Sequence, residues 1–213
     1  MKHILLFILI ASNVSAQGLS NIEGKANAME VAKKNLQDLK SGFLLVRLED
    51  KKTEIEYYQK YNNTAEAEKI KNKQDNIDEQ IRLAFTKYFT MCPVYYFKMN
   101  DTRNLLDEKY DEIKVYDDKG EIALNVDLAS GNFFIAEFGV ANQDEVTNEE
   151  DVNDGVYMER LALSALVIRQ SNMLELRDPF PYFVKYNTMG ALKSRYLGPV
   201  KKIQQKLTAF DVR

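Results

Sequence analysis

The chain has 213 residues, a formal net charge of −3 at pH 7 and one cysteine. A mildly acidic chain is a poor candidate for binding nucleic acid or an anionic membrane surface, and a single cysteine excludes an internal disulfide. The length is sufficient for one hydrophobic core, so a single domain is the expectation.

Residues 1–16 have the layout of a secretory signal peptide. A basic start at Lys2 precedes an apolar run over 4–11, and the small residue Ala16 stands at the expected cleavage site. The run is shorter than the ~20 residues that a membrane-spanning helix needs, although an uncleaved anchor is the alternative. We therefore predict an exported, periplasmic protein, with an extracellular location as the alternative, whose residues 17–213 form one globular domain.

Histidine is absent from this predicted mature chain, because the only histidine is His3. Without imidazole, the mature chain has no route to Ser-His-Asp or Cys-His catalysis and no His-based zinc site. Any enzyme built from it would depend on carboxylates, Lys, Tyr, Ser or Arg. The sequence predicts no cofactor, no metal site and no catalytic residue.

The first half of the chain predicts alternating helices and strands. Apolar residues at helical spacing indicate a helix over 24–40, which a Ser-Gly pair ends, and the short apolar run 43–48 indicates a buried strand. A helical segment over 51–61 and a longer helix over 65–88 follow, and Pro93 opens a strand over 93–98. The two strands and the intervening helices form a crossover unit, which predicts parallel pairing.

The long helix is the most polar element of this half. Thr64 is the expected N-terminal cap, and apolar residues such as Ile77, Ile81 and Phe85 share one face. The stretch "KNKQDN" in its middle is polar on every side. A helix of ~24 residues is ~36 Å long, so one end is expected to project beyond the body as a hairpin with 51–61.

The second half predicts antiparallel pairing and a last helix. A short helix is expected over 105–110, followed by a hairpin over 113–126 around "DDKG" and a strand over 132–139. Residues 163–176 indicate two strands around Ser171-Asn172, and Pro199 is expected in the first turn of the last helix. The predicted fold class is α/β to α+β: one mixed sheet with helices packed on it and one long polar helix.

Cys92 invites a catalytic reading, because Pro93 and a block of aromatic residues follow it. A reactive thiol needs a cation or a helix N-terminus to lower its pKa, whereas Cys92 follows the C-terminal end of the long helix. We therefore interpret Cys92 as a buried, inert side chain, which suits an oxidising compartment.

Two further patterns admit a functional and a plain interpretation. The acidic segment 148–155 matches a calcium loop poorly, because Gly155 falls one place early, and a solvated loop is the preferred interpretation. Asn62 and Asn100 begin N-glycosylation patterns, but we interpret both as turn residues.

Aromatic residues are numerous, and most are expected to fill the two faces of a covered sheet. The segment "DPFPYF" differs, because its prolines exclude a central strand. We expect this segment to form a lid on the core, with a pocket rim or docking patch as the alternative. Its binding-surface candidates are Phe180, Tyr182 and Phe183.

Four stretches in this order carry a resemblance: "GFLLVRL", "IRLAFTKYFTMCPVYYF", "NFFIAEFG" and "DPFPYFV". Together they cover about residues 41–183 and are similar to an uncharacterised group of small exported proteins of Bacteroidetes-type bacteria. The resemblance implies a Gram-negative periplasmic setting and argues against modification of the asparagine patterns. It carries no catalytic or binding residue over to this chain.

Three functions remain open from the sequence. The first is a non-enzymatic periplasmic binding or protein-interaction module with a protein or small-molecule partner in the cell envelope. The second is a small-ligand carrier with an aromatic pocket. The third is a carboxylate-based hydrolase, for instance with Glu137 paired with Glu175 or Asp178, although the spacing does not select these residues.

Overall fold

The fold was described from a computed structural model, which places residues 24–141, 163–187 and 192–212. The predicted signal peptide and the acidic segment 148–155 lie outside these ranges, so both stay predictions. Among the placed residues, every helix is too short or too polar to cross a membrane.

Five strands form one mixed sheet in the order β2-β1-β3-β4-β5. The central strand β1 (Phe43–Leu48) pairs in parallel with β2 (Val94–Lys98) on one side and with β3 (Phe133–Ala141) on the other. β4 (Leu163–Gln170) runs antiparallel to β3 and to the short edge strand β5 (Phe183–Lys185). The predicted mixed sheet and the parallel pairing of the crossover strands are confirmed.

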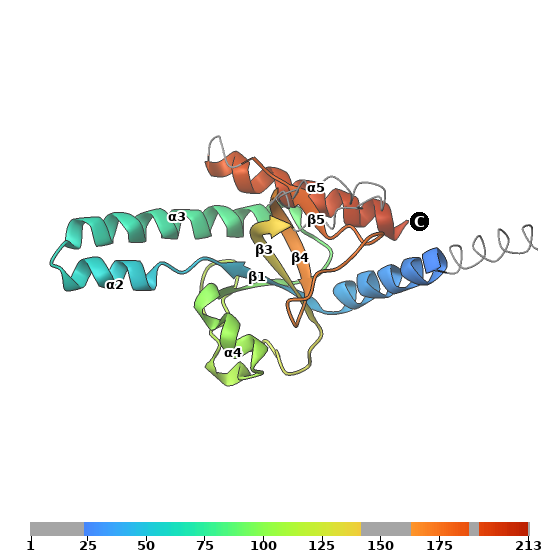
Figure 1. Cartoon of the computed structure of the whole chain (residues 1–213), viewed down its shortest axis with the longest axis horizontal. Helices are drawn as coiled ribbons and strands as arrows, with labels where there is room; N and C mark the ends of the chain where they lie inside the picture. Colours follow the sequence, from blue (N-terminus) through green and yellow to red (C-terminus); the bar gives the residue numbers. More distant parts are fainter. Residues whose placement is uncertain (1–23, 142–162, 188–191, 213) are drawn as a thin grey trace, which may run out of the picture.

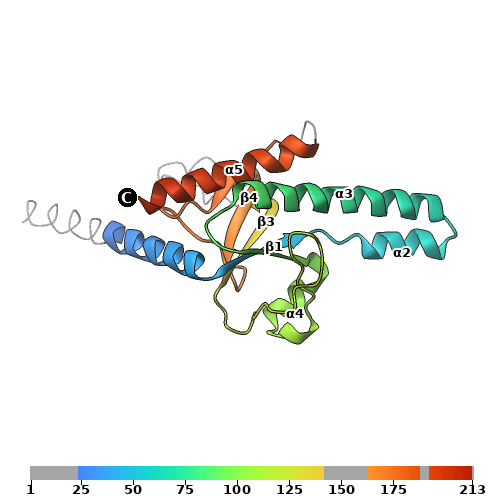
Figure 2. The same ribbon diagram turned by 180° about the vertical axis from the view of Figure 1, so that it is seen from behind.

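The helices surround this sheet unevenly (Figure 1). Residues 24–41 form a first helix, and α5 (Leu192–Asp211) is the last. Between β1 and β2, α2 (Lys52–Lys60) and α3 (Thr64–Tyr88) lie side by side and extend away from the sheet. The reverse view agrees, with the two helices projecting together on the side opposite the first helix (Figure 2). The predicted helical hairpin is thereby confirmed.

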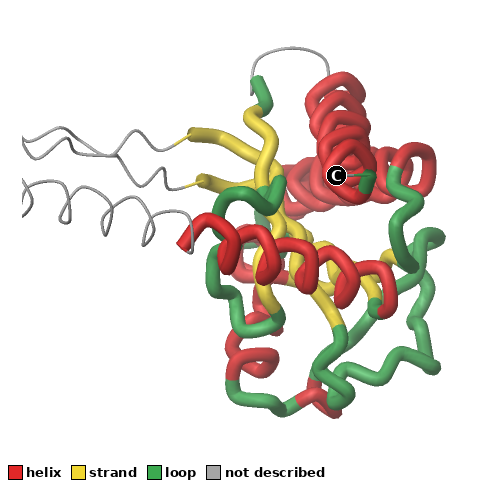
Figure 3. Tube along the Cα trace, turned by 90° about the vertical axis from the view of Figure 1, so that its right-hand side faces the viewer, coloured by secondary structure: helices red, strands yellow, loops and turns green. Residues whose placement is uncertain are grey.

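One face of the sheet is covered by helices. In Figure 3, α5 is seen nearly end-on beside the strands. The first helix, the inner part of α3 and α5 all contribute apolar side chains to this layer, as their periodicity predicts. Its buried members include Leu36, Leu39, Leu44, Val46, Ile81, Phe85, Tyr96, Ala136, Leu166, Ile168, Val200, Ile203, Leu207 and Phe210. This is the larger of the hydrophobic clusters.

The other face is covered by the segment between β2 and β3. This segment contains α4 (Thr102–Leu106) and two short 3-10 turns, and it lies below the sheet in Figure 1. Its apolar residues pack on alternate residues of the strands, so the sheet is buried on both faces. The second cluster comprises Leu45, Phe97, Leu105, Ile113, Val115, Leu128, Phe133 and Ile135.

Gly42 joins the first helix to β1 at a point where a side chain has no room. A Cβ atom at this position would lie 2.1 Å from the carbonyl oxygen of Asn132. The Gly42 N–H donates to Asp38 at 3.0 Å, which ends the helix, and the Phe43 N–H donates to Asn132 at 3.3 Å, which begins the sheet. The predicted helix stop is thus also the start of the strand pairing.

The predicted hairpin over 113–126 is wrong in extent. Tyr116 makes one antiparallel bridge to Ile122 and another to Tyr96. These bridges are isolated, and neither arm of the predicted hairpin forms a strand. Ile113 is buried in the second cluster, but Ile122 is 58% exposed and Leu124 is 88% exposed. In the second arm only Ala123 and Val126 pack on the second cluster, and a two-stranded ribbon with so little cover has little stability of its own.

Three smaller predictions also need correction. The last helix begins before Pro199, which lies inside α5 because the helix continues on both sides of it while packing on the core. The second strand after Ser171-Asn172 is reduced to a bridge between Arg169 and Glu175. The short helix expected at 105–110 is α4, which begins three residues earlier.

Candidate interaction surface

The outer half of α3 and the whole of α2 form the projecting hairpin, which is residues 52–77. α3 has 25 residues and is therefore about 37 Å long, longer than the sheet beneath it requires. Its inner half buries Ile81, Ala84 and Phe85 against the sheet and α5. Its outer half packs on α2 instead. A single helix thus has one half held by the core and one half held by another surface element.

The turn at the tip of the hairpin explains how the chain reverses. Asn62 adopts a positive φ of 57°, a conformation that asparagine tolerates better than most residues. The side chain of Asn63 then accepts a hydrogen bond from the Glu66 N–H at 3.3 Å and caps α3. The predicted cap, Thr64, is one residue late and is the first helical residue. Asn62 is exposed at this turn.

α2 has little support within the described fold. It is nine residues long, and none of them is buried. Isolated helices of fewer than ~12 residues are marginal in water. Its own ion pairs, such as Lys52 to Glu56 at 3.9 Å, are exposed and contribute at most about 0.5 kcal/mol each. α2 is therefore held mainly by α3 and presents most of its surface to solvent.

Three tyrosines gather at the end of α2, and we call Tyr57, Tyr58 and Tyr61 the tip tyrosines. The rings of Tyr57 and Tyr61 lie 4.8 Å apart and those of Tyr57 and Tyr58 lie 5.5 Å apart, measured between centroids. Tyr57 is 58% exposed and Tyr61 is 63% exposed. Clustered, exposed aromatic rings are enriched at protein interfaces, where they bury large apolar area and keep a polar hydroxyl.

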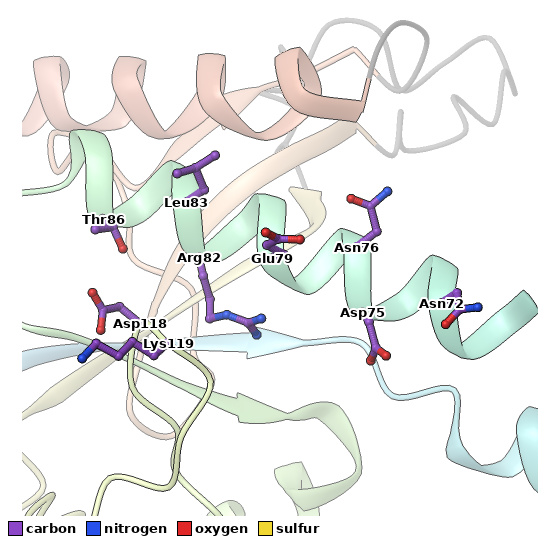
Figure 4. Close-up of a pocket in the computed structure, with 9 residues that line it drawn as sticks. All are labelled: Asn72, Asp75, Asn76, Glu79, Arg82, Leu83, Thr86, Asp118 and Lys119. Carbon is purple, nitrogen blue, oxygen red and sulfur yellow. The ribbon is translucent and has the colours of Figure 1, made fainter. Parts of the chain in front are cut away.

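A polar groove lies at the base of the hairpin, between α3 and the turn 117–120 (Figure 4). Arg82 extends from α3 toward the side where Asp118 and Lys119 lie, whereas Leu83 points away. Gly120 allows this approach, because it has a φ of +83° and a Cβ there would lie 3.3 Å from the Arg82 guanidinium carbon. The groove measures about 680 Å³ and is lined by Asn72, Asp75, Asn76, Glu79, Arg82, Leu83, Thr86, Asp118 and Lys119. Its mixed charges favour a polar partner surface over an apolar ligand.

A buried polar cluster marks the boundary between the two halves of α3. Asp78 is only 3% exposed and forms an ion pair with Lys98 of β2. Gln74 donates to Asp78 at 2.7 Å and to the carbonyl of Glu49 at 3.1 Å. Burial raises the pKa of Asp78, and this outweighs the hydrogen bonds from Lys98 and Gln74, which lower it.

The carboxylates named for a hydrolase form a structural ion network. Glu137 is 5% exposed, is paired with Arg47 and accepts a hydrogen bond from Arg169 at 2.7 Å. The same Arg169 donates to Glu175 at 2.8 Å, and Asp178 is exposed outside this network. Burial lowers the pKa of Arg169, but its hydrogen bonds to the two glutamates outweigh this and raise it. The guanidinium of Arg169 thus binds the carboxylates of both Glu137 and Glu175. This geometry does not support the hydrolase alternative.

The aromatic segment before β5 is divided between core and surface. Phe180 is fully buried and packs on Phe210 with ring centroids 6.2 Å apart, as the lid interpretation expects. Tyr182 and Phe183 are half-buried, with rings 4.9 Å apart, and the Nζ of Lys206 lies 5.6 Å from the Phe183 ring centroid. Phe180 contributes no exposed surface. A binding role for Tyr182 and Phe183 stays a prediction.

Cys92 lies between α3 and β2 and packs against the helix-covered core. Burial raises the pKa of its thiol to about 12, which leaves it protonated at neutral pH. Cys92 is partly rather than fully buried, and its inertness stays a prediction. In the ranges that the structure covers, no group of three or more acidic, cysteine or histidine side chains is arranged to hold a metal ion.

The aromatic residues of the strands mainly fill the two cores. A small pocket of about 230 Å³ does lie beside Phe43, Tyr95 and Pro93 at the start of the parallel strands. The ring of Phe43 stacks on Phe133 at 5.4 Å and meets Tyr95 edge-on at 5.6 Å. The pocket is smaller than the ~300 Å³ at which ligand sites usually begin, so it supports the carrier alternative weakly.

Comparisons with protein families, with curated proteins and with solved structures gave no match. The resemblance to exported proteins of Bacteroidetes-type bacteria therefore stays a prediction. The sequence indicated the projecting hairpin through the polar middle of α3. It gave no sign of the polar cluster around Asp78. Lys98, the ion-pair partner of Asp78, and Glu49, whose carbonyl accepts from Gln74, are brought to α3 by β2 and by the end of β1.

Proposed function

We propose that this chain is a non-enzymatic binding module of the cell envelope, acting in the periplasm, which presents the projecting hairpin to a partner protein. The observation that carries the proposal is α2, a nine-residue helix with no buried residue that ends in exposed tyrosines. The hydrophobic core of this fold does not need α2, so the requirements of folding alone do not explain why the helix is present.

The tip tyrosines supply the binding energy in this proposal. A tyrosine buries about 150–250 Å² when it is fully covered, and Tyr57 and Tyr61 are each more than half exposed. At about 25 cal/mol per Å², covering the exposed area of each ring is worth about 2–4 kcal/mol before the cost of association. Two such anchors, one in α2 and one at the residue that caps its end, are four residues apart and match the spacing by which helices dock into grooves.

The mixed charges around these anchors define the partner surface. α2 carries Lys52, Glu54, Glu56 and Lys60, which balance one another, and the groove at its base also carries both signs. The partner is thus expected to offer an apolar groove with a polar rim rather than a strongly charged surface. This expectation distinguishes the hairpin from a nucleic-acid or lipid-binding element.

The proposal is tested by placing a photoreactive residue at Tyr57 in the exporting cell and identifying the crosslinked protein. A single crosslinked partner is expected, because the anchor residue is covered in the complex. The double substitution Tyr57→Ser with Tyr61→Ser should lower the affinity of that partner by about 2 kcal/mol or more, as for central interface aromatics.

The matched control is Leu124→Ser, which removes an exposed apolar side chain from a different part of the surface. Its affinity for the crosslinked partner should equal that of the wild type. Equal binding by the wild type and the tyrosine variant would contradict the proposal.

A further inference from the structure

Another pocket lies where β5 meets the start of α5. It measures about 180 Å³. The end of β5 and the two residues after it form one wall, and the first three turns of α5 form the other. Its lining is Lys185, Tyr186, Asn187, Ser194, Arg195, Gly198, Pro199 and Lys202. The pocket shares no residue with the hairpin or with its groove.

The charged residues of this pocket are all of one sign. Lys185, Arg195 and Lys202 are cationic, and none of the described lining residues is acidic. Lys69 and Lys71 of α3 have carboxylate partners, Glu66 at 3.1 Å and Asp75 at 2.5 Å, but none of these three cations forms an ion pair with a described residue. In a chain of net charge −3, three cations that line one pocket create a local field opposite to that of the whole.

Arg195 gives this pocket an unused hydrogen-bond donor. Its Nε atom is buried and has no hydrogen-bond partner among the described residues. An unsatisfied buried donor costs about 1–3 kcal/mol, and more when the group is charged. A bound acceptor would remove this cost.

The position of the pocket adds a second electrostatic contribution. Ser194 and Arg195 lie in the first turn of α5, a helix of 20 residues with no acidic residue in that turn. The first N–H groups of a helix have no partner within it, and this end carries the positive end of the helix dipole. Both effects favour a negatively charged ligand.

We propose that this pocket binds one phosphate-monoester group, held by Arg195, Lys185 and Lys202. Its volume of about 180 Å³ is below the ~300 Å³ of sites for whole drug-sized ligands, so it accommodates a single anionic group. A phosphate monoester carries nearly two negative charges at pH 7 and offers three acceptor oxygens. Three cations match this charge, and the fork of Arg195 suits two of the oxygens.

The test is calorimetric titration of the full chain with inorganic phosphate at constant ionic strength. Saturable binding at one site is expected. Lys202→Gln and Arg195→Gln should each weaken it about tenfold, as the loss of one charge-assisted hydrogen bond predicts. Lys201→Gln is the matched control, because Lys201 is the exposed neighbour of Lys202 and does not line the pocket. Its affinity should equal that of the wild type.

A second measurement distinguishes the sources of the phosphate group. Vesicles that contain phosphatidic acid should retain the wild type but not Lys202→Gln if the ligand is a lipid headgroup. Binding of free phosphate without retention on these vesicles would indicate a soluble phosphate monoester. The proposal is overturned if phosphate does not saturate the wild type, or if all three variants, including Lys201→Gln, lose the same affinity.

Discussion

The two halves of α3 show how one helix serves two purposes. The inner half, residues 78–88, buries Phe85 and Ile81 between the sheet and α5. The outer half, residues 64–77, buries only Ala67 and Gln74 and has α2 as its cover. The helix is continuous across the boundary, so nothing local in its backbone distinguishes the halves. The difference is in what surrounds them.

This difference separates the demands of folding from those of binding. Burial of apolar area is the main stabilising contribution, and it is concentrated in the inner half. The outer half and α2 add little burial, yet they order many residues at an entropic cost. A hairpin that contributes so little to the core is better explained by a surface that it presents.

The largest expected effect is in the inner half. Phe85→Ala removes a ring that is 1% exposed and contacts the rings of Phe89, Tyr96 and Phe138. The free energy of unfolding should fall by about 3–5 kcal/mol, the usual cost of such a cavity. Chemical denaturation measures it. A loss below about 1 kcal/mol would show that the inner half is not part of the core.

The next effect concerns the length of the hairpin. Replacing residues 57–68 by a short Gly-Ser loop removes the tip tyrosines and Ala67, the only buried side chain in that range. The free energy of unfolding should fall by about 1 kcal/mol or less, because loop closure depends weakly on length. Thermal unfolding should stay cooperative. Loss of cooperativity would mean that the core depends on the tip.

A smaller, pH-dependent effect on the free energy of unfolding is expected at Asp78, at the boundary between the two halves of α3. The pKa of Asp78 is raised from its ordinary value of 3.8, so the folded state retains the proton at a pH where the unfolded state has released it. Its stabilising contribution is complete below pH 3.8 and is lost as pH rises through the higher folded pKa.

The variant Asp78→Asn tests the direction of this pH dependence, because asparagine does not titrate. The stability of the wild type relative to the variant should fall as the pH rises above 3.8. Denaturation at several pH values measures it. A relative stability that rises over the same range would contradict the direction of the shift.

The smallest effect on stability is expected at the tip. Tyr57→Ser combined with Tyr61→Ser should change the free energy of unfolding by about 0.5 kcal/mol or less, because both side chains are more than half exposed and their ring contacts lie at the surface among the tip tyrosines. The same denaturation assay measures it, with Phe85→Ala as the reference. A loss of several kcal/mol would indicate that the tyrosines stabilise the fold.

The sequence predicted the parts of the fold that depend on local pattern. The apolar run from Phe43 to Leu48 and its turn signals match β1 in both bounds. The inner faces of α3 and α5 follow from helical spacing of Ile81, Phe85, Ile203 and Leu207. Apolar runs and helical periodicity are properties of the sequence itself, so both can be read from it.

Tertiary packing decided the remaining features. Pro199 is tolerated inside α5, although proline usually begins or ends a helix. Leu124 alternates like a strand residue but finds no layer to cover it. The net charge of the whole chain does not predict the cationic pocket. Lys185 and Lys202 lie together only after β5 packs on α5.

The central claim is that the hairpin tip is dispensable for folding and required for binding. The most direct measurement is the affinity of the shortened variant, with residues 57–68 replaced, for the partner crosslinked at Tyr57. The variant is first shown to unfold cooperatively, so that an intact core is established. Loss of affinity by about 100-fold or more is predicted, since both aromatic anchors are removed. Binding as tight as that of the wild type would contradict the claim.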